Sequence, residues 1–197
     1  MNLLFLVEGE KTEPRIYNSW LKFFFSDIQA VARPEDMTGN TFRIISGRGY
    51  HQMLGRIEAC ILDLENYPKI DHLIICVDSE NEAYQSRFEE VAKEINKIIA
   101  LAPELSSVKH KIHIIIQHRC IETWALGNNE LTGGISSLSP DQKIEYQIFR
   151  EHYDVALKDP ESMDEYPPHK SFGGRQKFHQ KYFRRHLRHY QKYRQND

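Results

Sequence analysis

The chain has 197 residues, of which 40% are hydrophobic and 27% charged, with a formal net charge of −2. These values are typical of an ordinary soluble protein with one domain, or one domain and an appendage, and the sequence has no repeats or low-complexity tract. Hydrophobic runs of about five or six residues are far shorter than the roughly 20 needed to cross a bilayer. The first residues also lack a signal-peptide pattern. We therefore expect a cytoplasmic protein without membrane contact.

Charge is distributed unevenly along the chain. Residues 170–197 contain nine Lys and Arg against one acid, a net charge of +8, whereas residues 1–169 contain 17 against 27, a net charge of −10. An acidic body with a basic tail predicts that the tail meets a polyanion.

Strand and helix patterns alternate over the first 116 residues. Strands are predicted at 3–7, 41–45, 72–77 and 111–116, and helices from Pro14 to Phe24, from Met53 to Leu64, and from Phe88 to Ala102, before Pro103. The strands are apolar enough to be covered on both faces. This order predicts an α/β fold with an open, mostly parallel sheet of about four strands and helices on both faces.

Beyond the fourth strand, the pattern changes to short helices and polar loops. A short helix ending at Gly127 is predicted, then one from Pro140 to about Leu157, and a last one from Arg175 to Tyr193. We therefore expect two parts, a first domain at 1–130 and a helical C-terminal extension with the basic tail at 131–197.

The three cysteines, Cys60, Cys76 and Cys120, lie far apart and form no CxxC or Cys/His cluster. A zinc site or a disulfide framework is therefore not expected. Cys60 and Cys76 lie in apolar runs, which predicts that they are small core residues.

Carboxylates follow three of the predicted strands, at the end where α/β sheets bind ligands. Glu8 follows the first strand, Asp78 and Glu80 follow the third, and Glu122 comes shortly after the fourth. Such groups repel one another unless a cation neutralises them, and oxygen ligands alone indicate Mg²⁺ or Mn²⁺. Asp78 and Glu80, two apart in an extended segment, would point to the same side and share an ion.

The alternative is that these acids are helix caps or solvated loop residues, which is the commoner use of a single acid after a strand. Glu10, Glu13 and Glu82 fit that use, since acids favour the first turn of a helix. Acids at three separate strand ends favour the metal site.

The loop "SGRGYHQ" places Arg48 between two glycines. It is either a simple turn between strand and helix, or a loop from which the Arg48 guanidinium reaches a phosphate. It lacks the spacing of a Walker A loop, so we do not expect nucleotide hydrolysis by this chain.

Taken in order, four motifs over roughly residues 1–130 resemble the RloB-like branch of the Toprim family. They are "VEGEKTEP" after the first strand, "SGRG", "DSE" after the third strand, and "RCIETW" after the fourth. The resemblance implies a Toprim fold, as in topoisomerases, primases and anti-phage nucleases. It implies that Glu8 handles protons or binds metal, that Asp78 and Glu80 are the metal-binding acid pair, and that Glu122 is the acid of the last motif.

Two positions depart from the family's pattern. The second aspartate of the acid pair is Glu80, which is one methylene longer. The Asn-Pro before the cysteine is His118-Arg119, two candidates for phosphate contact in place of a rigid turn. In the same run Cys120 and Trp124 are predicted to pack, because a thiol offers little to Mg²⁺.

The resemblance implies a Mg²⁺- or Mn²⁺-dependent endonuclease that hydrolyses DNA or RNA, tRNA included, as an effector of bacterial defence against phage. Relatives are often encoded beside an ABC-type ATPase. In this hypothesis Glu8, Lys11 and Arg48 have catalytic roles, and Glu8, Asp78, Glu80 and Glu122 hold the metal.

The basic tail interleaves cations with aromatic residues, a mixture that suits phosphate contact and base stacking. Its predicted nucleic-acid-binding residues are Arg175, Lys177, Lys181, Arg184, Arg185 and Arg188. The alternative is an amphipathic helix that packs on the domain and keeps its cations in water.

A rival hypothesis is a non-catalytic nucleic-acid-binding or ATPase-regulating subunit, favoured by the longer acid at Glu80. A strand-passing topoisomerase or a primase would need domains that 197 residues do not supply. The polynucleotide, its sequence preference, the activating signal, the number of metal ions and a homo-oligomeric state stay open.

Overall fold

The structure is a computed structural model, and it describes residues 1–80, 82–126 and 140. Contacts along the chain define two compact units. The first comprises Met1–Val77 and Ala83–Ile116, and the second comprises Asp78–Glu82 and Gln117–Asp197. The predicted extension at 131–197 lies outside the described residues apart from 140, so the division at 130 stays a prediction.

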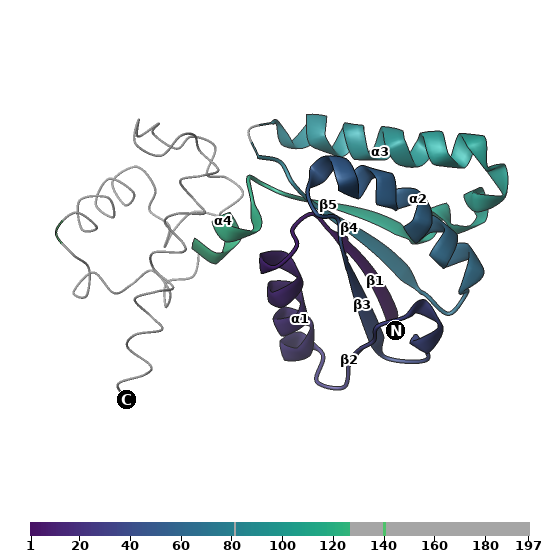
Figure 1. Ribbon diagram of the computed structural model, residues 1–197, viewed down its shortest axis with the longest axis horizontal. Helices are drawn as coiled ribbons and strands as arrows, with labels where there is room; N and C mark the ends of the chain where they lie inside the picture. Colours follow the sequence, from purple (N-terminus) through teal and green to yellow (C-terminus); the bar gives the residue numbers. More distant parts are fainter. Residues whose placement is uncertain (81, 127–139, 141–197) are drawn as a thin grey trace. The chain divides into compact units, whose positions relative to one another are not determined.

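The α/β prediction is confirmed (Figure 1). The described strands are β1 (Asn2–Val7), β2 (Gln29–Ala30), β3 (Thr41–Ser46), β4 (His72–Asp78) and β5 (Ile112–Gln117). The described helices are α1 (Thr12–Phe24), α2 (Tyr50–Asn66), α3 (Tyr84–Leu101) and α4 (Ile121–Leu126), with 3₁₀ helices η1 (Pro34–Asp36) and η2 (Pro103–Lys111). The sheet is parallel, in the order β2-β3-β1-β4-β5.

The sheet thus has one strand more than the predicted four. The additional strand, β2, has only two residues, both exposed, and therefore leaves no hydrophobic pattern in the sequence. Strand β1 lies at the centre, where Val7 pairs in register with Ser46 of β3 and with Cys76 of β4. The carboxyl ends of these three strands therefore lie at the same edge of the sheet.

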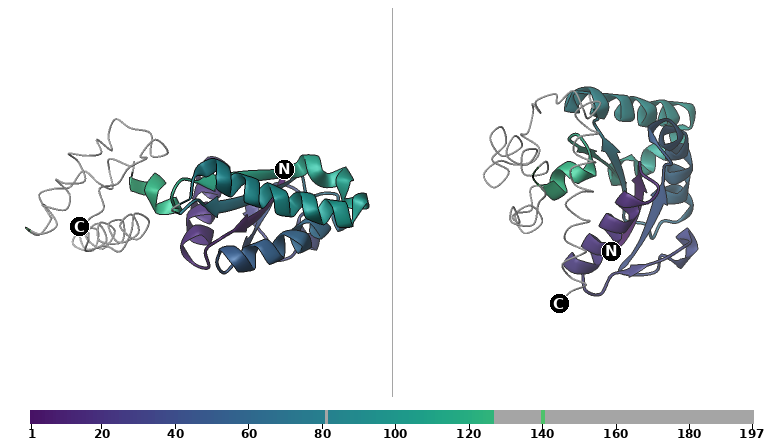
Figure 2. Two further views of the ribbon diagram at one scale, coloured as in Figure 1. Left: turned by 90° about the horizontal axis from the view of Figure 1, so that it is seen from above. Right: turned by 60° about the vertical axis from the view of Figure 1, so that its left-hand side comes forward.

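Helices cover both faces of the sheet, as predicted. Successive side chains of a strand point to opposite faces. Leu4 and Leu6 of β1 belong to one core cluster with apolar side chains of α2, α3 and η2. On the opposite face the ring of Phe5 lies 5.5 Å from that of Tyr17 in α1. Helices α2 and α3 lie side by side (Figure 2).

Helix α1 buries only part of its apolar side chains. Phe24 follows the helical spacing of the sequence, but it is 69% exposed. The buried residues of α1 are Glu13, Tyr17 and Leu21, spaced by four, and Phe24 at the last residue of the helix lies off this line.

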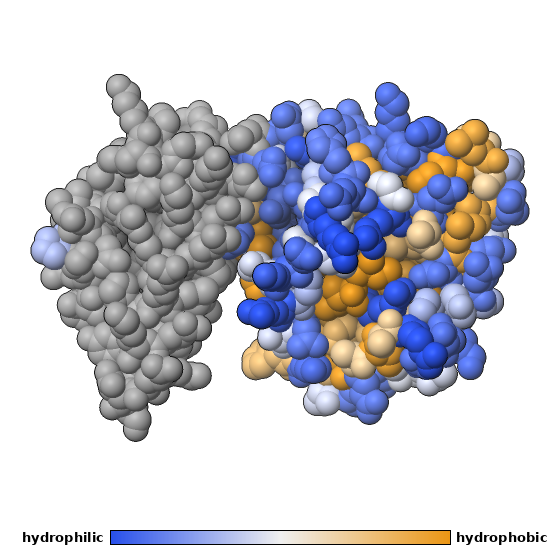
Figure 3. Space-filling view, viewed as in Figure 1, coloured by the Kyte–Doolittle hydropathy of each residue, from blue (hydrophilic) through white to orange (hydrophobic). Residues whose placement is uncertain are grey.

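On the face seen in Figure 3, hydrophobic side chains lie among hydrophilic ones. Within the described ranges no helix has both the length and the apolar character needed to span a bilayer.

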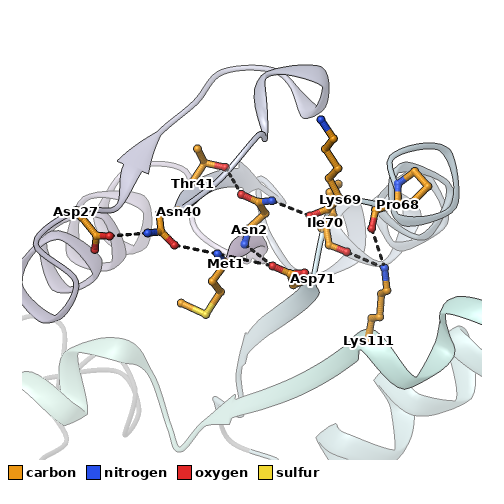
Figure 4. A network of polar contacts seen from close by, with 10 residues as sticks. All are labelled: Met1, Asn2, Asp27, Asn40, Thr41, Pro68, Lys69, Ile70, Asp71 and Lys111. Atoms are coloured by element: carbon orange, nitrogen blue, oxygen red, sulfur yellow. Dashed lines mark hydrogen bonds and ion pairs between the residues drawn. The ribbon is translucent and has the colours of Figure 1, made fainter.

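Polar side chains close the amino end of β1 (Figure 4). The side chain of Asn2, which is 7% exposed, donates from Nδ2 to the Lys69 carbonyl (2.8 Å) and accepts at Oδ1 from the Thr41 hydroxyl (2.9 Å). Its backbone N–H donates to Asp71 Oδ2 (2.7 Å). The amide therefore ties β1 to β3 and to the turn before β4.

We expect Asn2→Ala to lower the free energy of unfolding by about 2 kcal/mol, because it leaves the buried Thr41 hydroxyl and the Lys69 carbonyl without their partner. Urea unfolding followed by circular dichroism measures the change. Lys97→Ala, which removes an exposed ion pair with Glu94, is the control and is expected to have no measurable effect. Equal stability of the two variants would contradict the role of Asn2.

Candidate functional site

In the first unit, the glycine loop after β3 is hydrogen-bonded to the end of β1. The N–H of Gly47 donates to the Val7 carbonyl (2.6 Å), and the N–H of Gly49 donates to the Glu8 carbonyl (2.9 Å). A Cβ on Gly47 would collide with Met53 Cβ and lie 3.0 Å from the Val7 oxygen, and Gly49 has a φ of 102°. Both positions therefore need glycine, one for space and one for backbone conformation.

Arg48 stands between these glycines with a φ of 61° and an exposed side chain. Its N–H donates to the hydroxyl of Ser46 (3.2 Å). The N–H groups of residues 47, 48 and 49 are thus all used within the protein, and the loop does not offer them to an anion. The group of this loop that can reach a ligand is the exposed Arg48 guanidinium, and the loop itself is hydrogen-bonded to the Glu8 backbone.

We expect Gly47→Ala to lower the free energy of unfolding by about 1–3 kcal/mol, since the added methyl overlaps Met53 and crowds the end of β1. Chemical denaturation measures the loss. Gly55→Ala is the matched control, because Gly55 lies in α2 with open space around its Cβ position. That change is expected to stabilise the protein by about 0.5–1 kcal/mol. A neutral Gly47→Ala would show that the loop can move away from β1.

The acids after Glu8 have different surroundings. Glu13 is 4% exposed and its carboxylate accepts a hydrogen bond from the Gly9 N–H, so it closes the turn between β1 and α1. This agrees with the structural role considered for Glu13 in the sequence. Glu10 and Lys11 are exposed, and the catalytic role expected for Lys11 stays a prediction.

Arg87 is a buried cation that none of the motifs indicated. It lies in the first turn of α3 and is 7% exposed. Its guanidinium carbon lies 4.0 Å from the centroid of the Tyr50 ring, and its Nη1 donates to Glu90 Oε2 (2.8 Å). The Tyr50 hydroxyl donates to the same oxygen (2.8 Å). A signal was present in the sequence, because Arg87 precedes Val91 by four residues on the buried stripe of α3.

The charges of neighbouring groups act on Arg87 and Tyr50. Burial acts to lower the pKa of Arg87, but the hydrogen bond with Tyr50 and the charges of Glu90 and Glu8 outweigh it, and the pKa is raised above its ordinary value. The pKa of Tyr50 is also raised, first by burial, while Arg87 opposes the shift. In the first unit, the loop carrying Arg48 is therefore bonded to the backbone of Val7 and Glu8, and it leads into Tyr50, on which the buried Arg87 stacks.

In the second unit, the segment after β4 pairs with the segment after β5. Ser79 N–H donates to the Gln117 carbonyl (3.0 Å), and Glu80 N–H donates to the Arg119 carbonyl (2.8 Å). The Arg119 Nη1 in turn donates to the Glu80 carbonyl (3.1 Å). Residues that follow two different strands are thereby held side by side.

Two acids predicted after separate strands belong to this unit. Asp78 ends β4 and is 7% exposed, while Glu122 lies in the first turn of α4 and is 4% exposed. Burial raises the pKa of the Cys120 thiol well above its ordinary value, and the charges of Glu122 and Asp78 raise it further. Both buried acids thus belong to this unit, and the charge of each acts on the Cys120 thiol.

The structure corrects the expected geometry of Glu80. An extended segment would have pointed Asp78 and Glu80 to the same side, but Glu80 has a φ of 52°, in the left-handed region. Its backbone turns there because both its N–H and its carbonyl are bonded to Arg119. The side-chain alternation of a strand therefore does not apply between the two acids. A metal-binding role for Glu80 stays a prediction.

The two candidates for phosphate contact after β5 are buried. His118 is 8% exposed and its Nδ1 lies 3.1 Å from the Ser79 hydroxyl, and Arg119 is 6% exposed. The cysteines are buried as predicted, and burial raises the pKa of Cys60 to about 12. Cys120, whose sulfur lies 3.4 Å from the Thr123 hydroxyl, also fits the predicted packing role.

The donor chemistry of the second unit fits a hydrated divalent ion. No three His, Cys, Asp or Glu side chains form a metal-binding group within residues 1–80 and 82–126. Mg²⁺, however, usually keeps several waters and takes only one or two carboxylates from the protein. Asp78 and Glu122 supply two hard oxygen donors of this kind. Glu8 belongs to the first unit, and its predicted place among the ligands stays a prediction.

The predicted nucleic-acid-binding residues of the tail, Arg175, Lys177, Lys181, Arg184, Arg185 and Arg188, lie outside the described residues. Gly127 and the last two predicted helices, apart from residue 140, lie outside them as well.

Comparisons with known proteins give this chain no neighbour: no family model, no curated protein and no solved structure matches it. The resemblance to RloB-like Toprim proteins therefore rests on the motifs, and the parallel sheet is the kind of fold that it implies.

Proposed function

We propose that this protein is a Mg²⁺- or Mn²⁺-dependent phosphodiesterase that cuts nucleic acid. The observation that carries the proposal is two buried carboxylates in the second unit: Asp78, which ends β4, and Glu122, in the first turn of α4 after β5. Buried carboxylates cost free energy unless hydrogen bonds, a proton or a cation offset their charge. A divalent cation is the partner that suits two hard oxygen donors.

In this proposal Asp78 and Glu122 hold the ion, which when bound would activate water and stabilise the departing oxygen. Glu8 takes a proton from the attacking water. The exposed guanidinium of Arg48 binds two oxygens of the phosphate from a loop bonded to the Glu8 backbone. Lys11 offsets further charge on the substrate. The motifs and the basic tail support DNA or RNA as the polymer, and the family resemblance supports a role in phage defence with an ABC-type ATPase.

The test is cleavage of labelled single-stranded DNA, double-stranded DNA and a tRNA pool with Mg²⁺, Mn²⁺ or EDTA. We expect cutting of at least one of these with metal and none in EDTA. No cutting, together with no metal-dependent rise in melting temperature, would overturn the proposal. Metal-dependent stabilisation without cutting would indicate that the ATPase partner is required, and adding that partner would then have to restore cleavage.

A second candidate is a non-catalytic subunit that binds nucleic acid or regulates an ATPase. The observation that favours it is Glu80, whose backbone is held in the left-handed region by Arg119 and which is one methylene longer than the family's acid. A degenerate site of this kind predicts a melting temperature that does not respond to Mg²⁺ or Mn²⁺.

A further inference from the structure

The segment 46–50 is held from two sides in the first unit. On one side, the N–H groups of Gly47 and Gly49 donate hydrogen bonds to the carbonyls of Val7 and Glu8 at the end of β1. On the other side, Tyr50, which directly follows Gly49 and begins α2, is covered by the guanidinium of Arg87 from α3. Arg48 lies between these two attachments.

The second attachment is a closed set of three contacts. Arg87 stacks on the Tyr50 ring at 4.0 Å, and both Arg87 Nη1 and the Tyr50 hydroxyl donate to Glu90 Oε2 at 2.8 Å. A guanidinium over an aromatic face with a charged hydrogen bond at its edge has little freedom to move. The first turn of α3 is therefore fixed to the first residue of α2.

Packing alone does not account for an arginine at this position. The buried line of α3 continues from Arg87 through Val91, Ile95 and Ile98, and an apolar side chain would extend it. Burying a guanidinium costs several kcal/mol unless charges and hydrogen bonds offset the cost. Glu90 offsets part of it, and the charge of Glu8 also acts favourably on Arg87. The position thus combines stacking on Tyr50 with a positive charge on which the charge of Glu8 acts favourably.

We infer that Arg87 is a positioning residue, which stacks on Tyr50 and bonds to Glu90 and so fixes the segment carrying Arg48 against the strand end that carries Glu8. Its effect on cleavage rests on the proposed nuclease function. Its effect on the segment does not, because the hydrogen bonds of Gly47 and Gly49 exist whether or not the protein cleaves nucleic acid.

The first test is amide hydrogen exchange at Gly47 and Gly49 in the full chain. In Arg87→Met, which keeps length without the charge or the planar fork, we expect exchange of these two amides to become about tenfold faster or more. Amides of the β1–β4 pairing should be unchanged. Lys97→Ala, a change on the same helix away from Tyr50, is the control. Wild-type protection of both amides in folded Arg87→Met would overturn the inference.

A milder variant covers the case in which Arg87→Met does not fold. Tyr50→Phe keeps the ring beneath the guanidinium and removes only the hydroxyl bond to Glu90. We expect a smaller increase of exchange at Gly47 and Gly49 in this variant, about two- to fivefold. No increase in Tyr50→Phe, with Arg87→Met unfolded, would count against the inference.

The second test separates positioning from stability through kinetics. Misplacement of a group that contacts substrate by about 1 Å costs about a hundredfold in rate, so we expect kcat to fall about a hundredfold in Arg87→Met. Arg87→Lys keeps the charge but not the flat stack, and should recover about tenfold of that loss. KM should stay within about twofold. An unchanged kcat in variants with faster exchange would overturn the inferred effect of Arg87 on cleavage, but it would not contradict the proposed nuclease function. If the wild type does not cleave, the proposed function fails, and hydrogen exchange alone decides the inference.

Discussion

Metal-dependent cleavage is expected to fall by at least about a thousandfold when Asp78 is replaced by Asn or Glu122 by Gln. Each change keeps the size of a buried side chain and removes one of two carboxylates that act on the same thiol. If the two carboxylates hold the ion as proposed, a single remaining carboxylate would hold it weakly, and the reaction would lose the several kcal/mol by which the ion would lower the barrier. Single-turnover cleavage of the labelled substrate measures the loss.

A second readout shows that the loss comes from the metal. The wild type is expected to melt at a higher temperature in Mg²⁺ than in EDTA, because an ion that binds only the folded state stabilises it. Asp78→Asn and Glu122→Gln should lose this difference. Glu58→Gln, a change at an exposed acid of α2, should keep both the rate and the difference. Retention of wild-type rate and Mg²⁺ response by either buried-acid variant would contradict the assignment.

Glu8→Gln is expected to lower cleavage by about a hundredfold to ten-thousandfold while the Mg²⁺-dependent rise in melting temperature is kept. The reason is the proposed division of roles, in which Asp78 and Glu122 would hold the ion and Glu8 would act as the base. Glutamine keeps the shape of the side chain but cannot accept a proton from water. Cleavage rate and melting temperature are measured on the same preparation.

Glu10→Gln is the matched control for Glu8, because Glu10 is the next acid along the chain and is exposed. We expect it to keep the wild-type rate. A Glu8→Gln variant that also loses the Mg²⁺ response would make Glu8 a metal ligand instead of the base. A wild-type rate in Glu8→Gln would remove Glu8 from the reaction altogether.

Some corrections to the sequence analysis have a common physical origin. Glu80 was expected in an extended segment, but its backbone is set by hydrogen bonds to Arg119, far along the chain. Phe24 follows the helical spacing of α1, yet whether a helix position is buried depends on where the neighbouring sheet lies. Two-residue β2 exists because it pairs with β3, and too few residues are involved to leave a pattern.

Arg87 shows the same limit at the candidate site. A charged residue on an apolar stripe is visible in the sequence, but its partners are not. Tyr50 lies on a different helix, and only the packing of α2 against α3 brings the two together. The glycine loop shows the same limit. Its sequence does not reveal whether the N–H groups of Gly47 and Gly49 face a ligand, and in the fold they bond to the carbonyls of Val7 and Glu8 instead.

By itself the sequence determined the local features of this protein: the alternating strands and helices, the acids after the strands, the buried cysteines, and the glycines around Arg48. These follow from side-chain periodicity and backbone preference, which act over a few residues. Only the tertiary structure decided that Asp78 and Glu122 lie in one unit, that the loop around Arg48 bonds to the end of β1, and that Arg87 stacks on Tyr50 beside this loop. Parallel strands are joined through helices, so residues that meet at a sheet edge are distant in sequence, and no local pattern records their contact.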